Sequence, residues 1–316
     1  MPEPPPDGPW IGRANGKLIL LGEHAVVHGT PALVAGIELG VQARLTLGEP
    51  GTGRRMRLLE RECVAAARGP ELGQALEALL DSGGAPEALT IDVSGDLPPG
   101  MGLGFSAAAA VAVARAVERQ QHTSADPRRV EARATAWERV FHGNPSGVDV
   151  AAAMHGGCTR FHRVEGVRPV PLAEPLTICV GLTGTASSTK EMVEGVAALL
   201  ERDPELGKRS IDGIATLVDN AIDACEAGDL VTLGELLDLN QMLLSGLMLS
   251  NETIESMVRI AREAGALGAK LTGAGGGGAV FALAGSGPDA EPVARAIVAA
   301  WARAEYRGFV TRVEST

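Results

Sequence analysis

The sequence has few cysteines, no long hydrophobic run and no excess of positive charge. Its four cysteines lie far apart and include no CxxC pair, which is neither the spacing of a zinc site nor a dense disulfide framework. We therefore expect reduced cysteines and a cytoplasmic protein. The apolar run from Ala107 to Ala114 stops at Arg115 and is too short to span a bilayer, so no membrane-spanning segment is expected.

The acidic balance of charge argues against two classes of partner. The formal net charge is −11 and the isoelectric point is about 5.1. Nucleic acids and anionic membrane surfaces both require a basic face, so neither is an expected partner. A small anionic substrate remains compatible with this charge, because one site can be locally positive. The first ten residues lack a basic segment and an apolar segment, which predicts a flexible leader and no signal peptide.

Length and composition predict a folded protein of two domains or one large one. The chain has 316 residues, of which 45% are hydrophobic and 21% charged, enough to form a packed core. The second half alternates helical patterns with a few separated strands, which is typical of an α+β domain. We place the domain boundary at 175–185. Helices are expected at 106–121, 128–141, 190–201, 211–227, 230–249, 253–263 and 292–305.

A glycine-rich loop precedes the first of these helices. The stretch "LPPGMGLGFSAAAA", residues 97–110, places Gly100, Gly102 and Gly104 directly before a run of alanines. Glycines let a ligand approach the backbone, and a helix that starts there would direct free N–H groups at a phosphate. An ordinary turn into a helix explains the stretch equally well. It is neither a Walker A loop nor a good dinucleotide-binding motif, because the required residues do not follow.

A second cluster of glycines spans 273–278, in "KLTGAGGGGAVFAL". A flexible linker is one interpretation of such a run. Apolar strand patterns flank it closely on both sides, which instead favours a tight loop near a ligand.

Several polar residues occupy positions where chemistry is possible. Lys17 begins a buried strand, which is costly unless the side chain has a partner or a task. His24 and His28 have an HxxxH spacing, but the segment has the pattern of a strand and a turn, so a metal site is not favoured. Glu138 and Asp149 could bind Mg²⁺ or orient a hydroxyl group. A solvated helix acid and a helix cap are the more ordinary interpretations of these two residues.

Four segments together resemble one enzyme family, the GHMP-type small-molecule kinases, and within it the mevalonate kinases. Their order along the chain matches the family, and the similarity spans roughly residues 12–285. The segments are "GKLILLGEHAVVHG", "PPGMGLGFSAAAAVA", "ERVFHGNPSGVD" and "KLTGAGGGGAVFAL". The stretches "SSTKEMV" and "NQMLLSGLMLS" are also similar to mevalonate kinases.

The resemblance implies a fold and a reaction. It implies an α+β, two-domain GHMP kinase fold, with a ribosomal protein S5-like domain over 10–180 and a ferredoxin-like domain over 181–316. It implies transfer of phosphate from ATP to the 5-hydroxyl of mevalonate, with Mg²⁺ as cofactor. It also implies a homodimer, with no nucleic acid or membrane as partner.

The resemblance further assigns roles to single residues. Asp149 matches the catalytic carboxylate and Lys17 the lysine beside it. Ser106 and Glu138 match the pair associated with Mg²⁺. Positions near the substrate are matched by Glu23, His24, Ser146 and Thr189. The phosphate-binding loop is matched by Gly100, Met101, Gly102, Leu103, Gly104 and Ser106.

Three positions depart from the family pattern. Phe105 stands where the loop usually has serine, Asn15 where the first motif has proline, and His28 where a tyrosine is usual. None belongs to the expected catalytic set, and we expect Phe105 to point away from the phosphates. Two alternatives remain: another GHMP kinase, for phosphomevalonate, homoserine or a sugar, or a non-catalytic nucleotide-binding homologue.

Overall fold

The computed structural model describes residues 8–82, 84–121 and 124–314, and the chain divides into two compact units. Unit 1 consists of Met1–Gly16, Leu39–Leu97 and Gly104–Met154. Unit 2 consists of Lys17–Glu38, Pro98–Leu103 and His155–Thr316. Neither unit is continuous in sequence, because the first two long strands are divided between the units and the segment 98–103, which belongs to unit 2, interrupts unit 1. The expected boundary between 180 and 181 stays a prediction.

The sheet of unit 1 has the order β4-β3-β5-β2, and β1 also pairs with β2. Strands β2 and β5 pair in antiparallel fashion, whereas β3 and β5 are parallel. Buried residues alternate with half-buried ones along most of β5, which places one face of the sheet against the core. The strands are β1 (Trp10–Leu21), β2 (Ala32–Leu47), β3 (Arg54–Leu58), β4 (Arg61–Val64) and β5 (Leu89–Gly95).

Unit 1 contains helices α1 (Glu71–Asp81), α2 (Phe105–Gln121), α3 (Pro127–His142) and α4 (Val148–Met154). The alanine-rich α2 is almost wholly buried and packs tightly on β1. A Cβ atom at Gly12 would lie 1.9 Å from the carbonyl oxygen of Ala112, so this approach requires glycine.

Three helices of unit 1 share a buried ionic contact. Arg133 of α3 donates from Nε to Oε1 of Glu118 on α2 at 2.8 Å, and from a terminal nitrogen to the carbonyl oxygen of Leu79 on α1 at 3.0 Å. Both charged side chains are at most 1% exposed. The contact fixes α3, the helix that carries Glu138, because breaking a buried pair leaves an uncompensated charge.

Unit 2 contains an antiparallel sheet with the order β11-β8-β10-β9. Its strands are β8 (Leu176–Leu182), β9 (Gly268–Thr272), β10 (Ala279–Ser286) and β11 (Arg307–Val313). The beginning of β2 also lies in this unit, where it pairs with β6 (Cys158–His162), and β6 pairs with β7 (Gly166–Val170). A short 3-10 helix, η1 (Ala25–His28), follows β1.

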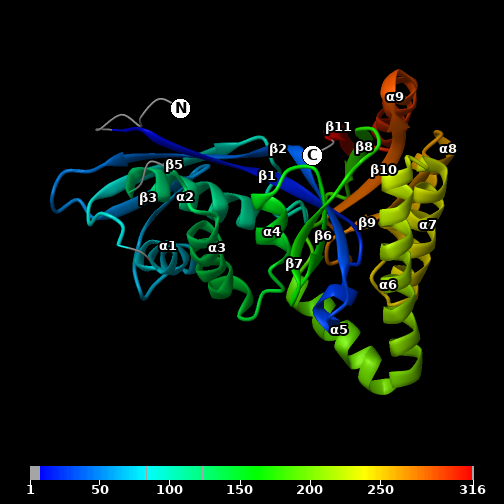
Figure 1. Cartoon of the computed structure of the whole chain (residues 1–316), viewed down its shortest axis with the longest axis horizontal. Helices are drawn as coiled ribbons and strands as arrows, with labels where there is room; N and C mark the ends of the chain where they lie inside the picture. The colour runs from blue at the N-terminus through cyan, green and yellow to red at the C-terminus, as the bar shows by residue number, and fades with distance from the viewer. Residues whose placement is uncertain (1–7, 83, 122–123, 315–316) are drawn as a thin grey trace. The chain divides into compact units, whose positions relative to one another are not determined.

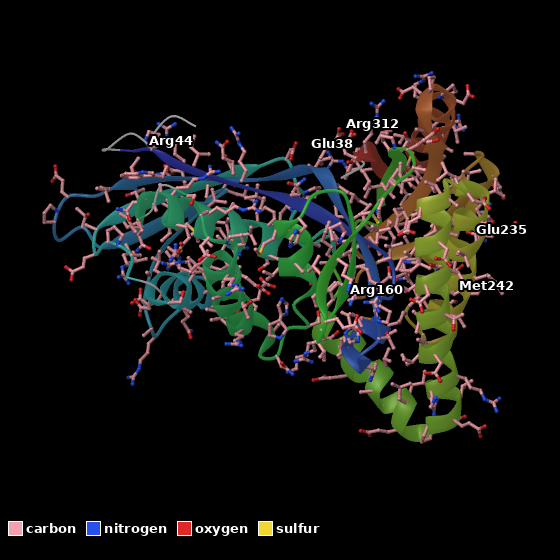
Figure 2. The ribbon with its side chains drawn as sticks, in the orientation of Figure 1. Glu38, Arg44, Arg160, Glu235, Met242 and Arg312 are labelled. Carbon is pink, nitrogen blue, oxygen red and sulfur yellow. The ribbon has the colours of Figure 1, made fainter. Side chains whose placement is uncertain are left out.

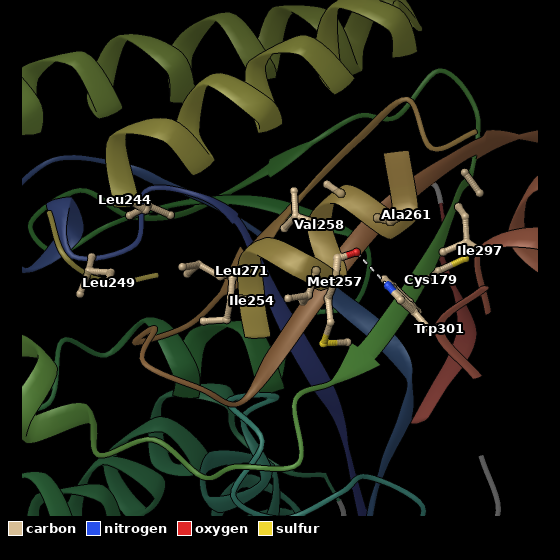
Figure 3. Close-up of a cluster of buried hydrophobic side chains, with 14 of the residues drawn as sticks. Cys179, Leu244, Leu249, Ile254, Met257, Val258, Ala261, Leu271, Ile297 and Trp301 are labelled. Atoms are coloured by element: carbon tan, nitrogen blue, oxygen red, sulfur yellow. Dashed lines mark hydrogen bonds between the residues drawn. The ribbon is translucent and has the colours of Figure 1, made fainter. Parts of the chain in front are cut away.

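Helices α8 (Glu252–Glu263) and α9 (Gly287–Arg303) pack on the four-stranded sheet (Figure 1). Their apolar side chains form a core with the sheet, centred on Met257, Trp301 and Leu271 (Figure 3). Trp301 donates from Nε1 to the carbonyl oxygen of Met257 at 2.9 Å, which ties α9 to α8 inside this core.

The remaining helices of unit 2 are α5 (Thr189–Arg202), α6 (Pro204–Ala227) and α7 (Leu230–Gly246). Helices α6 and α7 lie side by side, and α7 also contacts β9. Glu235 and Met242 of α7 point away from the helix on its exposed side, where Met242 is 68% exposed (Figure 2). Within the described part of the chain, no helix is both long and apolar enough to cross a membrane.

These elements confirm the expected α+β fold class, but some helix boundaries differ. Helix α6 begins at Pro204, seven residues before the expected start, because Asp203 caps it by accepting from the Leu206 N–H at 3.1 Å. Helix α9 begins at Gly287 and includes Pro292, which was expected as its first residue. Helix α4 was not expected. It starts directly after the Gly-Pro turn that contains Ser146.

Candidate active site

The loop before α2 has the backbone that its glycines predict. Gly100, Gly102 and Gly104 have φ angles of +74°, +74° and +78°, which L side chains rarely adopt. The carbonyl oxygen of Leu103 accepts a hydrogen bond from the Lys17 N–H at 2.9 Å, which ties the loop to β1. The expected phosphate-binding segment is therefore a tight turn that leads directly into a long helix, whose first N–H groups are free to bind an anion.

Ser106 and Glu138 meet at the start of α2. The Ser106 hydroxyl donates to Oε1 of Glu138 at 2.5 Å and accepts from Nε1 of Trp137 at 3.2 Å. Glu138 is only 3% exposed, and its Oε2 lies 3.6 Å from Nε2 of His142. The two oxygens expected to act together are thus side by side. Trp137, which orients the hydroxyl, was missed by the sequence reasoning.

Glu23 and His24 lie in a buried turn between β1 and η1. Glu23 forms an ion pair with Lys270 of β9, and both side chains are fully buried. His24 has a φ of +59° and an exposed fraction of 6%. Its Nε2 lies 2.8 Å from the carbonyl oxygen of Ala274, so Nε2 carries a proton and donates. The turn is thereby fixed to both β9 and the second glycine-rich loop.

Burial shifts the pKa values of these groups toward their neutral forms. Burial raises the pKa of Glu23 above its usual value, although Lys270 opposes the change. Burial likewise lowers the pKa of Lys270, against the attraction of Glu23. The pKa of His24 is also lowered by burial, which keeps its ring neutral near pH 7. The sequence held one signal for Lys270, a lone lysine within an apolar strand.

The loop at 273–278 is tight and mostly buried, which agrees with the expected tight loop and not with a flexible linker. That a ligand lies near it stays a prediction. Gly273, Gly275, Gly276 and Gly278 all have positive φ angles. This loop also lies against the first one, because a Cβ atom at Gly102 would be 3.4 Å from the carbonyl oxygen of Thr272. Unit 2 therefore brings together two glycine loops, Lys17 and the Glu23–His24 turn.

The other expected residues lie at the beginnings of helices. Asp149 is the second residue of α4, where a carboxylate is favoured by the helix dipole. The Val148 N–H donates to Oγ of Ser146 at 3.4 Å. Thr189 is the exposed first residue of α5 and follows its cap, Ser188.

The expected site residues divide between the two units. Unit 1 contains Gly104, Ser106, Glu138, Ser146 and Asp149, whereas unit 2 contains Lys17 and the remaining positions at 23–24, 100–103 and 189. The catalytic pairing of Asp149 with Lys17 stays a prediction. Among the described residues, no group of three or more His, Cys, Asp or Glu side chains could hold a metal ion.

Two family models match the chain. The model of the GHMP kinases N terminal domain matches residues 71–157, and the model of the GHMP kinases C terminal matches residues 221–303. A mevalonate kinase of Pyrococcus horikoshii is 33% identical over 297 residues, which cover 87% of this chain and 88% of that protein. A mevalonate kinase of Aeropyrum pernix is 36% identical over 285 residues, which cover 85% and 87% respectively.

Solved structures agree with this relationship. The structure of L. major mevalonate kinase in complex with R-mevalonate has a TM-score of 0.83 and 32% identity, and the match covers 98% of this chain and 96% of that one. The Methanococcus jannaschii mevalonate kinase has a TM-score of 0.82 at 21% identity, covering 98% and 99%, which supports the fold. The chain belongs to the GHMP kinase family.

Proposed function

We propose that this protein transfers the γ-phosphoryl group of ATP to the 5-hydroxyl of mevalonate, giving 5-phosphomevalonate and ADP. The mevalonate kinases described above, one of them bound to R-mevalonate, support this substrate. The contact between Ser106 and Glu138 is the observation that carries the chemistry, because it places two oxygen ligands at the end of a glycine loop and the start of a helix.

The loop and the start of α2 bind the phosphates of ATP. The N–H groups of the segment Gly100–Gly104 donate to phosphate oxygens, and the positive end of the α2 dipole favours their charge. Phosphoryl transfer depends mainly on positioning and charge neutralisation, so a rigid loop with free donors supplies much of what the reaction needs.

Ser106 and Glu138 fit Mg²⁺. The ion prefers oxygen ligands and binds through one or two protein groups together with phosphates and water. A hydroxyl and a buried carboxylate already in contact satisfy that requirement. When bound, Mg²⁺ neutralises charge on the phosphate oxygens. Trp137 holds the Ser106 hydroxyl in place for it.

Asp149 and Lys17 act on the hydroxyl group of the substrate. The 5-hydroxyl oxygen forms a bond to the γ-phosphorus, the bond from that phosphorus to the β–γ bridging oxygen breaks, and ADP leaves. The hydroxyl proton passes to Asp149. Because a carboxylate is a much weaker base than an alkoxide, transfer occurs late, after bond formation has acidified the hydroxyl. Lys17 orients Asp149 and stabilises charge on the oxygen.

Glu23, His24, Ser146 and Thr189 position the substrate. His24 is neutral and donates from Nε2 to a backbone carbonyl, which leaves Nδ1 as an acceptor for a substrate hydroxyl. The fixed turn that holds Glu23 and His24 presents these groups without the entropic cost of ordering a loop.

A coupled assay of ADP release tests this function over mevalonate, phosphomevalonate, homoserine and galactose. The proposal expects the highest kcat/KM with mevalonate. A preference for another substrate would assign a different GHMP kinase activity. The absence of ADP release with all four would favour a non-catalytic nucleotide-binding homologue.

Ser106→Ala should raise the Mg²⁺ concentration required for half-maximal activity, because it removes one of the two oxygens that hold the ion. Titration of activity with Mg²⁺ at saturating ATP measures this. Ser94→Ala, in strand β5, is a matched control with an unchanged titration. If the Ser106→Ala titration coincides with that of the unchanged protein, Ser106 does not hold Mg²⁺ and acts only in the first turn of α2.

We also propose a cytoplasmic location and a homodimer, with neither nucleic acid nor membrane as partner. The four cysteines are free, which suits a reducing compartment.

A further inference from the structure

The carbonyl groups of the glycine-rich loop at 273–278 accept hydrogen bonds from side chains of separate segments. Ala274 accepts from His24, Gly275 from the Ser187 hydroxyl, and Gly276 from Nδ2 of Asn251 at 3.1 Å. Gly278 accepts from the Thr183 hydroxyl at 3.0 Å. All these residues belong to unit 2.

Two N–H groups of the same loop are also fixed. Gly276 donates to the carbonyl oxygen of Leu249 at 2.7 Å, and Gly278 donates to that of Thr185 at 2.8 Å. Among the described residues, the N–H groups of Ala274, Gly275 and Gly277 donate no hydrogen bond. Buried N–H groups are almost always paired. We therefore expect these three N–H groups to donate to an acceptor outside the loop.

The loop has little room to move against its neighbours. A Cβ atom at Gly275 would lie 2.4 Å from the carbonyl oxygen of Leu249, and one at Gly277 would lie 2.8 Å from that of Thr185. The segments around 185 and 249 therefore pack closely against the loop. Ser187 and Asn251 lie two residues after Thr185 and Leu249 in these segments, and the proposed mechanism uses neither side chain.

We propose that Asn251 and Ser187 are positioning residues, whose side chains hold the Gly273–Gly278 loop in the conformation in which its N–H groups can bind a ligand. The inference rests on the proposed kinase function. Their hydrogen bonds fix the carbonyls of Gly275 and Gly276, so that the neighbouring N–H groups keep one orientation. His24 donates to the same loop, so a displaced loop also displaces the turn that carries Glu23.

Asn251 performs two tasks that can be separated by mutation. Its Oδ1 accepts from the Ile254 N–H at 3.0 Å and caps α8, while its Nδ2 donates to Gly276. Aspartate caps a helix as well as asparagine does but has no hydrogen to donate when it is ionised. Asn251→Asp therefore keeps the cap and replaces the donor with a carboxylate that faces a carbonyl oxygen.

The experiment compares Asn251→Asp and Ser187→Ala with Asp229→Ala. Asp229 caps α7 by accepting from the Thr232 N–H at 3.0 Å and from the Thr232 hydroxyl at 2.7 Å. Its removal should lower Tm, since a lost cap costs about 0.5–2 kcal/mol, and leave kcat unchanged. Asn251→Asp should do the reverse, with a nearly unchanged Tm and a kcat lowered about 10- to 100-fold through misplaced groups. Ser187→Ala should lower kcat in the same direction.

Hydrogen exchange of the peptide that contains 273–278 separates this proposal from the proposed function. Both loop variants should exchange faster there, and Asp229→Ala should not. Faster exchange with no kinase activity in any of the proteins would support the positioning role of Asn251 and Ser187 and reject the proposed kinase function. Unchanged exchange together with unchanged kcat in Asn251→Asp and Ser187→Ala would overturn the positioning role.

Discussion

Asp149→Asn is expected to lower kcat for mevalonate phosphorylation by about 10²–10⁴-fold, the range that a positioned proton acceptor supplies. The amide keeps the size of the side chain but cannot take the hydroxyl proton. Because Asp149 acts on the hydroxyl group, the affinity for ATP should change little. Steady-state kinetics with mevalonate, together with direct titration of ATP, measure both quantities. Lys17→Met should lower kcat in the same direction.

A matched control is available within the same unit. Asp126 caps α3 by accepting from the Arg128 N–H at 2.9 Å, and Asp126→Asn makes the same chemical change while keeping a capping residue. This variant should retain the kcat of the unchanged protein. If Asp149→Asn also turns over at the unchanged rate, Asp149 is not the proton acceptor.

Lys270→Met should lower the free energy of unfolding by about 3–5 kcal/mol, because removal of one partner leaves Glu23 buried without its counter-charge. The Lys270 ammonium also donates to the carbonyl oxygen of Leu271 at 2.6 Å and lies 5.3 Å from the centroid of the Phe281 ring, so its loss affects several contacts. Urea unfolding followed by circular dichroism measures the change.

Two further variants interpret the Lys270→Met result. Lys208→Met, at an exposed pair with Asp212 on α6, should cost at most about 1 kcal/mol. The double variant Lys270→Met with Glu23→Leu should recover much of the lost stability, since it removes both buried charges. If Lys270→Met is as stable as Lys208→Met, the buried pair of Glu23 and Lys270 contributes little to the stability of the fold.

Local signals in the sequence predicted much of the fold. Asp126 followed by proline marks the start of α3, and the alanine run marks α2, which begins one residue before the expected position. The start of α6 was placed too late because most of its first residues are polar or exposed, so the apolar spacing begins only at Ile211. Helix α4 has seven residues, too few for a periodic pattern to be recognised.

The local geometry of the candidate site was predicted for the same reason. Glycine-rich turns and a serine next to a helix start are local features, so both tight loops and the place of Ser106 in the first turn of α2 followed from the sequence. The binding roles of these residues stay predictions. The Glu23–Lys270 pair joins residues 247 positions apart, and no local pattern indicates which residues a buried lysine meets. Asn251 and Ser187 were missed likewise, because each contacts the loop only through the tertiary fold.

The position of the phosphate in the product tests the central claim most directly. After incubation with ATP, Mg²⁺ and mevalonate, proton-coupled ³¹P NMR should show a new phosphomonoester signal split into a triplet by the two protons on C5. A phosphomonoester signal without that splitting would place the phosphate on the tertiary hydroxyl. That result, or the absence of any phosphorylated mevalonate, would contradict the assignment.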